Sequence, residues 1–286
     1  MMRFVLAKMI SPSWLALLIC LTSCSTVSQN LGSTDQPTVQ SLFDRTDLWV
    51  DQAQAITLDS YDSSRALVFM VYGQSNSASY GERGYFVTKP VFMMHRGEAY
   101  RYRDPAVGAT GRGGSVWGMV GDQLIDRTDT SEVYFSLSGF GNKSIAELTR
   151  GPFLDYFKTQ LQMTKNTLGK IDGILIFHGE SNHKARSGSS DYARDFKLLE
   201  KEIRTISSAP IFLSQTSYCG DEESDSQLLE IQEDLAINMK GVMRGPNTDQ
   251  LIDSRFRGPD KCHFSKEGFK ELAELWVFSI LNASEI

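Results

Sequence analysis

A serine framed by two amide side chains follows an apolar run in the stretch MVYGQSNS, residues 70–77. Ser75 lies between Gln74 and Asn76, and Gly73 ends the apolar run. A serine hydroxyl can attack an ester carbonyl when a histidine accepts its proton and a carboxylate orients that histidine. The alternative is an ordinary polar turn after a strand. The choice between them depends on finding such a histidine elsewhere in the chain.

His263 has the most suggestive surroundings of the four histidines in the chain. In GPDKCHFS, Asp260 precedes it by three residues, a spacing that lets the carboxylate fold back and accept the proton of one ring nitrogen. The other ring nitrogen could then accept the proton of Ser75. We expect His95 to lie at the surface and His183 at the rim of a pocket.

The segments that must position these residues alternate between strand and helix. Five short apolar runs are typical of strands that are covered on both faces. They are residues 66–72, 132–137, 171–177, 210–216 and 250–253. Apolar residues recur at helical spacing between them, and Ser265 is expected to cap the last helix. The pattern predicts an α/β fold, a three-layer α/β/α sandwich with a mainly parallel five-stranded sheet. Ligands bind such sheets at the carboxyl ends of strands, where Ser75 is expected.

Two stretches differ from this alternation. Residues 85–103 are expected to form a hairpin or loop inserted after the first strand. The sequence RGGS at residues 112–115 lacks the Lys-Ser/Thr ending of a phosphate-binding loop, so we interpret it as a flexible connection. Ser115 is then expected to cap a helix over residues 116–125.

Four blocks follow one another in the order GQSN, SGFGNKSI, HGESN and DKCHFS. In this order they resemble the SGNH hydrolases, and in particular the branch with GQSN and GES motifs, which contains sialate O-acetylesterases and carbohydrate acetylesterases. The blocks span residues 73–265, about two thirds of the chain. The resemblance implies an SGNH/flavodoxin-like fold. The G-x-S-x-G motif of standard α/β-hydrolases does not occur in the sequence.

The resemblance implies a role for each matching residue. Ser75 would attack the ester carbonyl, His263 would act as general base and then acid, and Asp260 would orient His263. Backbone N–H groups of Ser75 and of a glycine in the second block would hold the oxyanion. Gly139 and Gly141 both qualify because SGFGNKS is longer than the usual paired-glycine turn, and Gly141 is preferred.

The third block departs from the family pattern. Relatives usually carry Gln or Asn before Gly-Glu-Ser, and its side-chain N–H reaches the oxyanion, whereas this chain carries His178. A neutral imidazole has one N–H, so His178 either donates it to the oxyanion or only packs and bonds to the backbone. Glu180 is expected to be a buried carboxylate that holds the loop. Gln74 and Asn76 are assigned to the oxyanion or substrate-binding site.

The N-terminus has the pattern of a secreted lipoprotein. Arg3 and Lys8 precede an apolar run that is too short to span a bilayer. LTSCS resembles a lipobox, which implies cleavage before Cys24 and lipidation of that cysteine; a plain signal peptide is the alternative. The expected divisions are a signal peptide at residues 1–23, a lipidated cysteine with a polar tether at residues 24–60, and an esterase-type domain at residues 61–286.

The two remaining cysteines and the overall charge narrow the chemistry further. Cys219 and Cys262 would lie near the site in an oxidising compartment, where a disulfide would fix the loop that carries His263; two buried free thiols are the alternative. The net charge of -6, without a Lys/Arg cluster, argues against a nucleic-acid partner. The sequence has neither H-E-x-x-H nor the paired cysteine spacing of a zinc site, so no metal or cofactor is expected.

These observations favour a monomeric serine esterase of the bacterial cell envelope, periplasmic or at the outer membrane. It would remove O-acetyl groups from a carbohydrate and be held at the membrane by its N-terminal lipid. Two alternatives remain open: a non-catalytic glycan-binding lipoprotein, and a lipid esterase or thioesterase. A lipase would need a broad apolar cleft near Ser75. The insertion offers apolar side chains for such a cleft or for stacking on sugars: Tyr85, Phe86, Phe92, Met93, Met94, Tyr100 and Tyr102.

Overall fold

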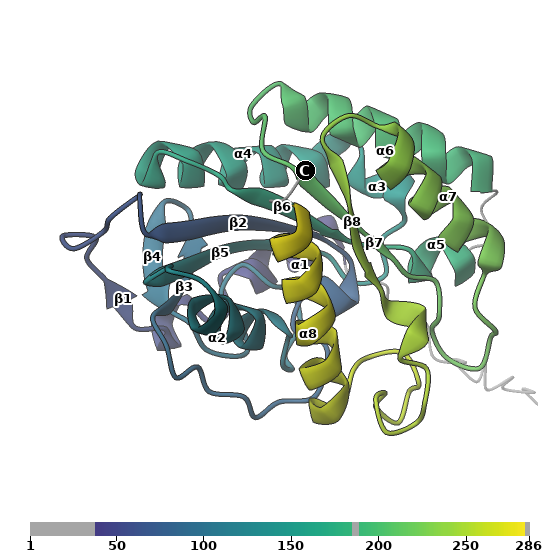
Figure 1. The fold of residues 1–286 in the computed structure, drawn as a ribbon, viewed down its shortest axis with the longest axis horizontal. Helices are drawn as coiled ribbons and strands as arrows, with labels where there is room; N and C mark the ends of the chain where they lie inside the picture. Colours follow the sequence, from purple (N-terminus) through teal and green to yellow (C-terminus); the bar gives the residue numbers. More distant parts are fainter. Residues whose placement is uncertain (1–37, 185–188, 284–286) are drawn as a thin grey trace, which may run out of the picture. The chain divides into compact units, whose positions relative to one another are not determined.

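A mixed eight-stranded sheet forms the core of the computed structural model, which describes residues 38–184 and 189–283 (Figure 1). The sheet order is β1-β4-β3-β5-β2-β6-β7-β8. The strands are β1 (Ala55–Ile56), β2 (Ala66–Gly73), β3 (Val91–His95), β4 (Glu98–Arg101), β5 (Glu132–Gly139), β6 (Gly173–Phe177), β7 (Ile211–Gln215) and β8 (Val242–Asn247). Neighbours from β3 through β8 in this order are parallel, whereas β4 is antiparallel to β3 and to β1.

Helices cover both faces of the sheet (Figure 1). One face carries α2 (Trp117–Arg127) and α8 (Lys266–Asn282). The other carries α1 (Val39–Thr46), α3 (Ile145–Leu148), α4 (Gly151–Leu168), α6 (Ser189–Arg204) and α7 (Ser226–Asn238). A short helix, α5 (Glu180–Lys184), follows β6.

Alternate side chains of β2 explain why its sequence is a continuous apolar run. Phe69 and Val71 pack in the core beneath α2 and α8, whereas Met70 and Tyr72 pack in the core beneath α4 and α6. Successive side chains of a strand point to opposite faces of the sheet. When helices cover both faces, every side chain is buried, so polar residues do not alternate with apolar ones. The Tyr72 ring stacks on Phe157 of α4 at a centroid distance of 4.2 Å.

The predicted α/β fold with helices on both faces is confirmed, but the prediction of a five-stranded sheet is wrong. Four of the five predicted runs contain strands, whereas residues 250–253 begin at the last residue of the short 3-10 helix η3 (Thr248–Gln250) and form no strand. The strand at this edge is instead β8, with the sequence VMRGPN. Its Arg, Gly and Pro conceal the strand pattern, and proline is tolerated there because an edge strand does not need every N–H.

The insertion at residues 85–103 contains a hairpin, as predicted, but the hairpin extends the main sheet. β3 pairs in parallel with β5, and β4 pairs with β3. Arg96 and Gly97 connect them with positive φ angles of 51° and 83°, as a tight two-residue hairpin turn requires. The predicted surface position of His95 is wrong, because β3 carries it into the core with 2% exposure, and its Nε2 lies 2.6 Å from Asp47 Oδ1.

The folded part begins earlier than residue 61. Residues 38–60 contain α1, the 3-10 helix η1 (Val50–Gln52) and β1, so they are part of the fold rather than a tether. Leu42 of α1 is fully buried, and the Phe43 ring stacks on Tyr156 at 5.4 Å. The predicted signal peptide, Cys24 and the start of the tether lie outside the described residues. Within the described part, no helix combines the length and apolar character that crossing a membrane requires.

The RGGS stretch is a close contact between two loops and not a flexible connection. Gly114 pairs with Gly81, and a Cβ added to Gly114 would lie 2.2 Å from Glu82 O. The predicted cap at Ser115 is also wrong, because α2 begins at Trp117 and its N-cap, Val116, makes no side-chain hydrogen bond. The Ser115 hydroxyl is instead 2.6 Å from the Tyr102 hydroxyl.

Candidate active site

Ser75 begins a 3-10 turn, η2 (Ser75–Ser77), immediately beyond the end of β2. Gly73 permits this turn, because a Cβ at that position would lie 2.0 Å from Phe177 O at the end of β6. The Gln74 N–H donates to the same carbonyl at 3.2 Å. Ser75 is 7% exposed and opens the turn, so its backbone N–H has no acceptor within the turn. It therefore lies at the carboxyl ends of two central parallel strands, where ligands bind in such sheets.

The two amides beside Ser75 contact other parts of the site. Gln74 Oε1 accepts a hydrogen bond from the Ser181 N–H at 2.9 Å. Asn76 Nδ2 donates to Glu180 Oε1 at 2.7 Å and to Cys262 O at 3.3 Å. Both side chains are buried, so these contacts hold the turn of Ser75 against neighbouring loops. They give Gln74 and Asn76 a supporting role, and the assignment of these residues to the oxyanion or substrate-binding site stays a prediction.

Asp260 and His263 form a hydrogen-bonded pair on one loop. His263 Nδ1 lies 2.6 Å from Asp260 Oδ2, while Asp260 Oδ1 accepts from the N–H groups of Cys262 and His263 at 3.0 Å each. Burial alone would raise the pKa of Asp260, but hydrogen bonds from His263 and from these backbone N–H groups outweigh it and lower the pKa below its usual value. An ionised Asp260 requires a proton on His263 Nδ1, so Nε2 is left as an acceptor.

His263 Nε2 is buried and has no hydrogen-bond partner among the described residues. We call residues 258–263 the base loop, after the role that the family resemblance implies for His263. This loop and the turn of Ser75 are joined, because Asn76 donates to the carbonyl of Cys262, the residue before His263. Catalytic serine–histidine hydrogen bonds are often long in free enzymes and shorten when substrate binds. His263 Nε2 is therefore a buried nitrogen without a partner among the described residues, in a loop that is joined to the turn of Ser75.

The register of β5 distinguishes the two candidate oxyanion glycines. Phe140 N–H donates to Gly73 O at 2.9 Å, so the backbone groups of Gly139 point to the opposite side, away from β2. On that side the Gly139 carbonyl accepts a hydrogen bond from Thr110 Oγ1 at 3.0 Å. Gly141 lies beyond the strand, and its N–H makes only a long contact of 3.4 Å with Thr110 Oγ1. Gly141 thus differs from Gly139 in lying beyond the strand with one long contact at its N–H, and the preference for Gly141 stays a prediction.

His178 donates its single ring N–H to a backbone carbonyl. The side chain is fully buried, and Nε2 lies 2.9 Å from Lys143 O, which can only accept. Burial lowers the pKa of His178 to about 4, so the neutral ring carries its proton on Nε2 and none on Nδ1. Of the two roles considered for His178, this contact corresponds to backbone bonding. Its effect is to hold the loop that contains Gly141.

Glu180 occupies the buried position expected for it. It is fully buried, and burial raises the pKa of its carboxyl group. Arg257, which is 4% exposed, donates to Cys262 O at 2.7 Å, the same carbonyl that accepts from Asn76. Arg257 therefore holds the base loop directly, and Glu180 holds it through Asn76.

A disulfide joins Cys219 to Cys262, the residue before His263. Cys219 lies in the loop after β7, and the two cysteines are 43 residues apart. The bond is a third constraint on the base loop, beside the hydrogen bonds from Asn76 and Arg257 to Cys262 O.

Replacing both Cys219 and Cys262 by Ser is expected to lower the free energy of unfolding by about 4 kcal/mol, because a loop of this length loses much of its unfolded-state entropy when closed. Urea denaturation of the variant and of the oxidised wild type measures the difference. Wild type denatured in the presence of a reductant should behave like the variant. A loss below about 1 kcal/mol would mean that the hydrogen bonds to Cys262 O fix the loop without the disulfide.

Two cavities adjoin the base loop, and both are lined by carboxylates. One, of about 250 Å³, is lined by Tyr80, Glu82, Asp260 and His263 among others. The second, of about 490 Å³, is lined by Tyr218, Lys261 and the acidic run Asp221, Glu222 and Glu223. His183 does not line either cavity; it lies 3.0 Å from Glu222 and 3.3 Å from Asp225, and thus holds the acidic loop.

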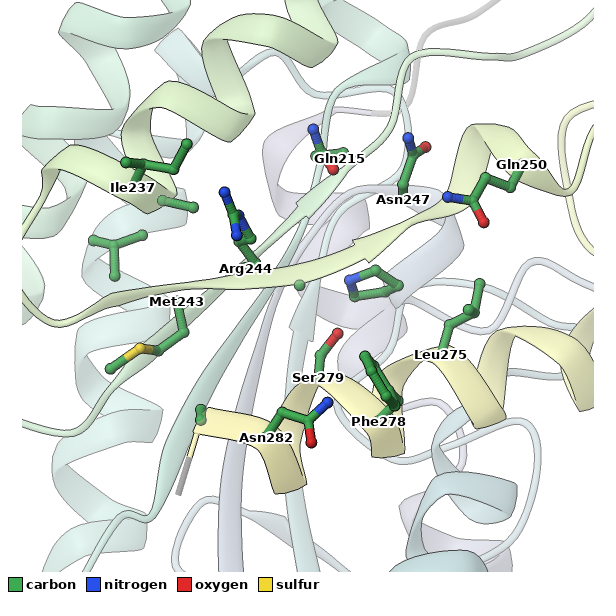
Figure 2. Close-up of a pocket in the computed structure, with 15 residues that line it drawn as sticks. Gln215, Ile237, Met243, Arg244, Asn247, Gln250, Leu275, Phe278, Ser279 and Asn282 are labelled. Atoms are coloured by element: carbon green, nitrogen blue, oxygen red, sulfur yellow. The ribbon is translucent and has the colours of Figure 1, made fainter. Parts of the chain in front are cut away.

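A larger cavity of about 740 Å³ lies elsewhere, along the free edge of β8 between α7 and α8 (Figure 2). Ile237, Arg244 and Phe278 contribute to its walls. None of its lining residues belongs to the four sequence blocks, so size alone does not identify the site. Among the described residues, no group of three or more His, Cys, Asp or Glu side chains could hold a metal ion.

Three residues of the site were not predicted from the sequence: Tyr80, Thr110 and Arg257. The Tyr80 ring stacks on His263 with a centroid distance of 5.6 Å. Arg257 stands out only in retrospect, as a cation in the Gly/Pro-containing loop before Asp260. Thr110 lies in AVGATGRGG, where nothing in the sequence distinguishes it from a loop threonine.

Comparison with known proteins supports the fold. No family model and no curated protein matches the chain. A solved protein from Arabidopsis thaliana matches with a TM-score of 0.61 at 15% identity, covering 76% of this chain and 98% of that one. A carbohydrate acetylesterase from Xanthomonas citri matches with a TM-score of 0.52 at 12% identity, over 74% of this chain and 55% of that one. A family 3 carbohydrate esterase from Clostridium thermocellum matches with a TM-score of 0.50 at 14% identity, over 76% and 96%. The chain thus has an α/β fold of the kind found in these esterases.

Proposed function

We propose that the protein is a serine esterase that removes O-acetyl groups from carbohydrates. The observation that carries this proposal is the hydrogen-bonded pair of Asp260 and His263, whose loop is tied to the turn of Ser75 through Asn76. A serine, an imidazole with a free Nε2 and an ionised carboxylate are the groups that ester hydrolysis through an acyl-enzyme requires. The fold shared with solved esterases supports the same reaction class.

The proposed reaction has two halves. Ser75 Oγ attacks the ester carbonyl while its proton moves to His263 Nε2, and the N–H groups of Ser75 and Gly141 stabilise the oxyanion. The intermediate then expels the sugar alcohol, which takes the proton from Nε2. Water attacks the acetyl-serine with the same histidine as base, and acetate leaves as Ser75 regains its proton. Asp260 stays ionised throughout and keeps His263 in the required tautomer.

The acyl group is proposed to be short. A lipid esterase would need exposed apolar side chains near Ser75, and the insertion was the expected source. Five of its seven apolar candidates are buried in the sheet core: Phe92, Met93, Met94, Tyr100 and Tyr102. The Tyr85 hydroxyl donates a hydrogen bond to Asp122. Of the seven candidates, only Phe86 is largely exposed, at 83%.

The alcohol is proposed to be a neutral sugar rather than a sialic acid. Five carboxylates line the two cavities beside the base loop: Glu82, Asp260, Asp221, Glu222 and Glu223. Lys261 is paired with Asp221 and Lys266 with Glu82, while the buried Arg257 donates to backbone carbonyls. Like charges in a cleft disfavour an anionic ligand. We therefore expect an acetylated neutral polysaccharide to be deacetylated faster than O-acetylated sialic acid, and the difference to shrink as salt is added.

The function is tested by ester hydrolysis with the chain from Ser25 onward. We expect p-nitrophenyl acetate to have a kcat/KM at least about 10-fold above that of the octanoate, because most apolar side chains of the insertion are buried and cannot line a cleft for the octanoate chain. Acetate release from acetylated xylan and from O-acetylated sialic acid then compares the two classes of alcohol. A folded protein inert toward every ester would favour the non-catalytic glycan-binding alternative. Preference for the octanoate would favour a lipid esterase.

The cellular setting is proposed from the sequence alone. Signal cleavage before Cys24 and lipidation of that cysteine would hold a monomeric esterase in the bacterial envelope, at the periplasmic or outer-membrane surface. Mass spectrometry of the N-terminal peptide from the native host would detect the lipid on Cys24. An unmodified Cys24 after cleavage would indicate a plain secreted protein.

A further inference from the structure

The buried hydroxyl of Thr110 lies between Gly141 and Tyr80, whose ring stacks on His263. Thr110 is fully buried in the loop between β4 and α2. Its Oγ1 lies 3.0 Å from Gly139 O, 3.4 Å from Gly141 N and 3.4 Å from the Tyr80 hydroxyl. Two of these partners are the backbone groups that flank Phe140 at the end of β5.

The direction of each hydrogen bond follows from counting protons. A carbonyl can only accept, so the single proton of Thr110 goes to Gly139 O. The Gly141 N–H can only donate, so Thr110 accepts from it. Tyr80 must then also donate, because Thr110 has no second proton to offer. One donated and two accepted hydrogen bonds use the full capacity of a hydroxyl group.

Tyr80 connects this hydroxyl to the base. Its ring stacks on His263 at a centroid distance of 5.6 Å and an interplanar angle of 22°. Its hydroxyl also faces Gly141, since a Cβ added there would lie 2.5 Å from Tyr80 Oη. Thr110 thus contacts the proposed oxyanion glycine directly and the proposed base through one aromatic ring.

We propose that Thr110 is a positioning residue that anchors the loop of Gly141 and the Tyr80 ring beside His263. This inference rests on the proposed function. By binding the carbonyl of Gly139 and the N–H of Gly141, the hydroxyl fixes the peptide planes on both sides of Phe140. By accepting from the Tyr80 hydroxyl, it also fixes the ring that stacks on His263. The loop and the imidazole are then in place before substrate arrives, and preorganised groups stabilise the transition state more than the bound substrate.

The test replaces the hydroxyl while keeping the shape of the side chain. In Thr110→Val we expect kcat for p-nitrophenyl acetate to fall about 10- to 100-fold with KM changed less than about 3-fold, because the Gly141 loop and the Tyr80 ring on His263 lose their shared anchor. Thr110→Ser retains the hydroxyl and should stay within about 5-fold of wild type. Inactivation by a p-nitrophenyl alkylphosphonate, whose oxygen also enters the oxyanion site, should slow in parallel with kcat in Thr110→Val.

A matched control separates this role from general stability. Thr46 is also fully buried and donates to a backbone carbonyl, Phe43 O, at 2.7 Å in α1. Thr46→Val should lower the midpoint of thermal unfolding without changing kcat of the folded protein. Thr110→Ala replaces Thr110→Val if the valine variant does not fold, with the same expected loss.

Three results would overturn the positioning role. They are unchanged kcat in a folded Thr110→Val, a KM increase that accounts for the whole loss, and a Thr110→Ser variant as slow as Thr110→Val. A wild-type protein with no activity toward any ester would instead refute the proposed function, and the phosphonate measurement would then show no labelling of Ser75 in either protein.

Discussion

Replacing Ser75 by Ala is expected to lower kcat for p-nitrophenyl acetate by about 10⁴- to 10⁶-fold, because the variant cannot form an acyl-enzyme. The turn that Ser75 begins is held by backbone hydrogen bonds, from Ser77 N–H to Gln74 O and from Ala78 N–H to Ser75 O, which the substitution leaves intact, so the fold should be retained. Stopped-flow or long-time assays of p-nitrophenol release, with background hydrolysis subtracted, measure the loss. The phosphonate reagent should add one equivalent to wild type and none to Ser75→Ala.

Ser138 provides the control for this substitution. It is fully buried near the end of β5, and its hydroxyl has no hydrogen-bond partner among the described residues. Ser138→Ala should keep kcat within about 3-fold of wild type, since it removes a hydroxyl that makes no interaction. Equal activity of Ser75→Ala and wild type would exclude Ser75 as nucleophile.

Replacing Asp260 by Asn is expected to lower kcat by about 10³- to 10⁴-fold. The amide oxygen would stay at the Oδ1 position, where the N–H groups of Cys262 and His263 donate to it. Its NH₂ group would then face His263 Nδ1, which now lies 2.6 Å from Oδ2. Nδ1 would have to accept, so the proton of the neutral ring would move to Nε2. His263 could no longer take the proton of Ser75.

The pH dependence and a loop control refine this prediction. Because the pKa of Asp260 is lowered in the folded state, its ionised form contributes stability above the usual carboxyl pKa, and this stability is lost as the pH falls through the folded-state value. Asp260→Asn should remove that acid-side loss of stability in urea titrations at several pH values. Asp221→Asn breaks only the exposed pair with Lys261, so it should leave kcat unchanged and alter the pH dependence of stability much less than Asp260→Asn does. A loss below about 10-fold for Asp260→Asn would contradict an orienting role.

The central sheet was predictable from the sequence, whereas its edges were not. β2, β5, β6 and β7 lie between helices, so their apolar runs are unbroken and bounded by turn residues. β8 pairs with β7 alone and can therefore carry Arg244 and Pro246, which removes the pattern used to recognise a strand. On the other side, the hairpin of β3 and β4 resembled an insertion because its pairing with β5 depends on contacts distant in sequence.

In the candidate site, the local motifs were predictable from the sequence, whereas the long-range hydrogen bonds that hold them in place were not. Asp260 and His263 are three residues apart, so their hydrogen bond follows from a local turn. The amide of Asn76 reaches Cys262 O across 186 positions of sequence, and Thr110 reaches Gly139 O across 29. Such contacts depend on how loops from different strands meet. The burial of His95 was missed for the same reason, because only the tertiary pairing of its strand covers it.

Because Asp260 and His263 share one tight turn, the acid and the imidazole form a cassette that moves as a unit. A displacement of residues 258–263 would carry the imidazole away from the nucleophile without breaking the hydrogen bond within the cassette. The proton on His263 Nδ1 would therefore give the same NMR signal whether the imidazole lies beside Ser75 or is displaced from it. Catalysis therefore depends on the position of this cassette. That position is fixed at Cys262 by the hydrogen bonds from Asn76 and Arg257 and by the disulfide.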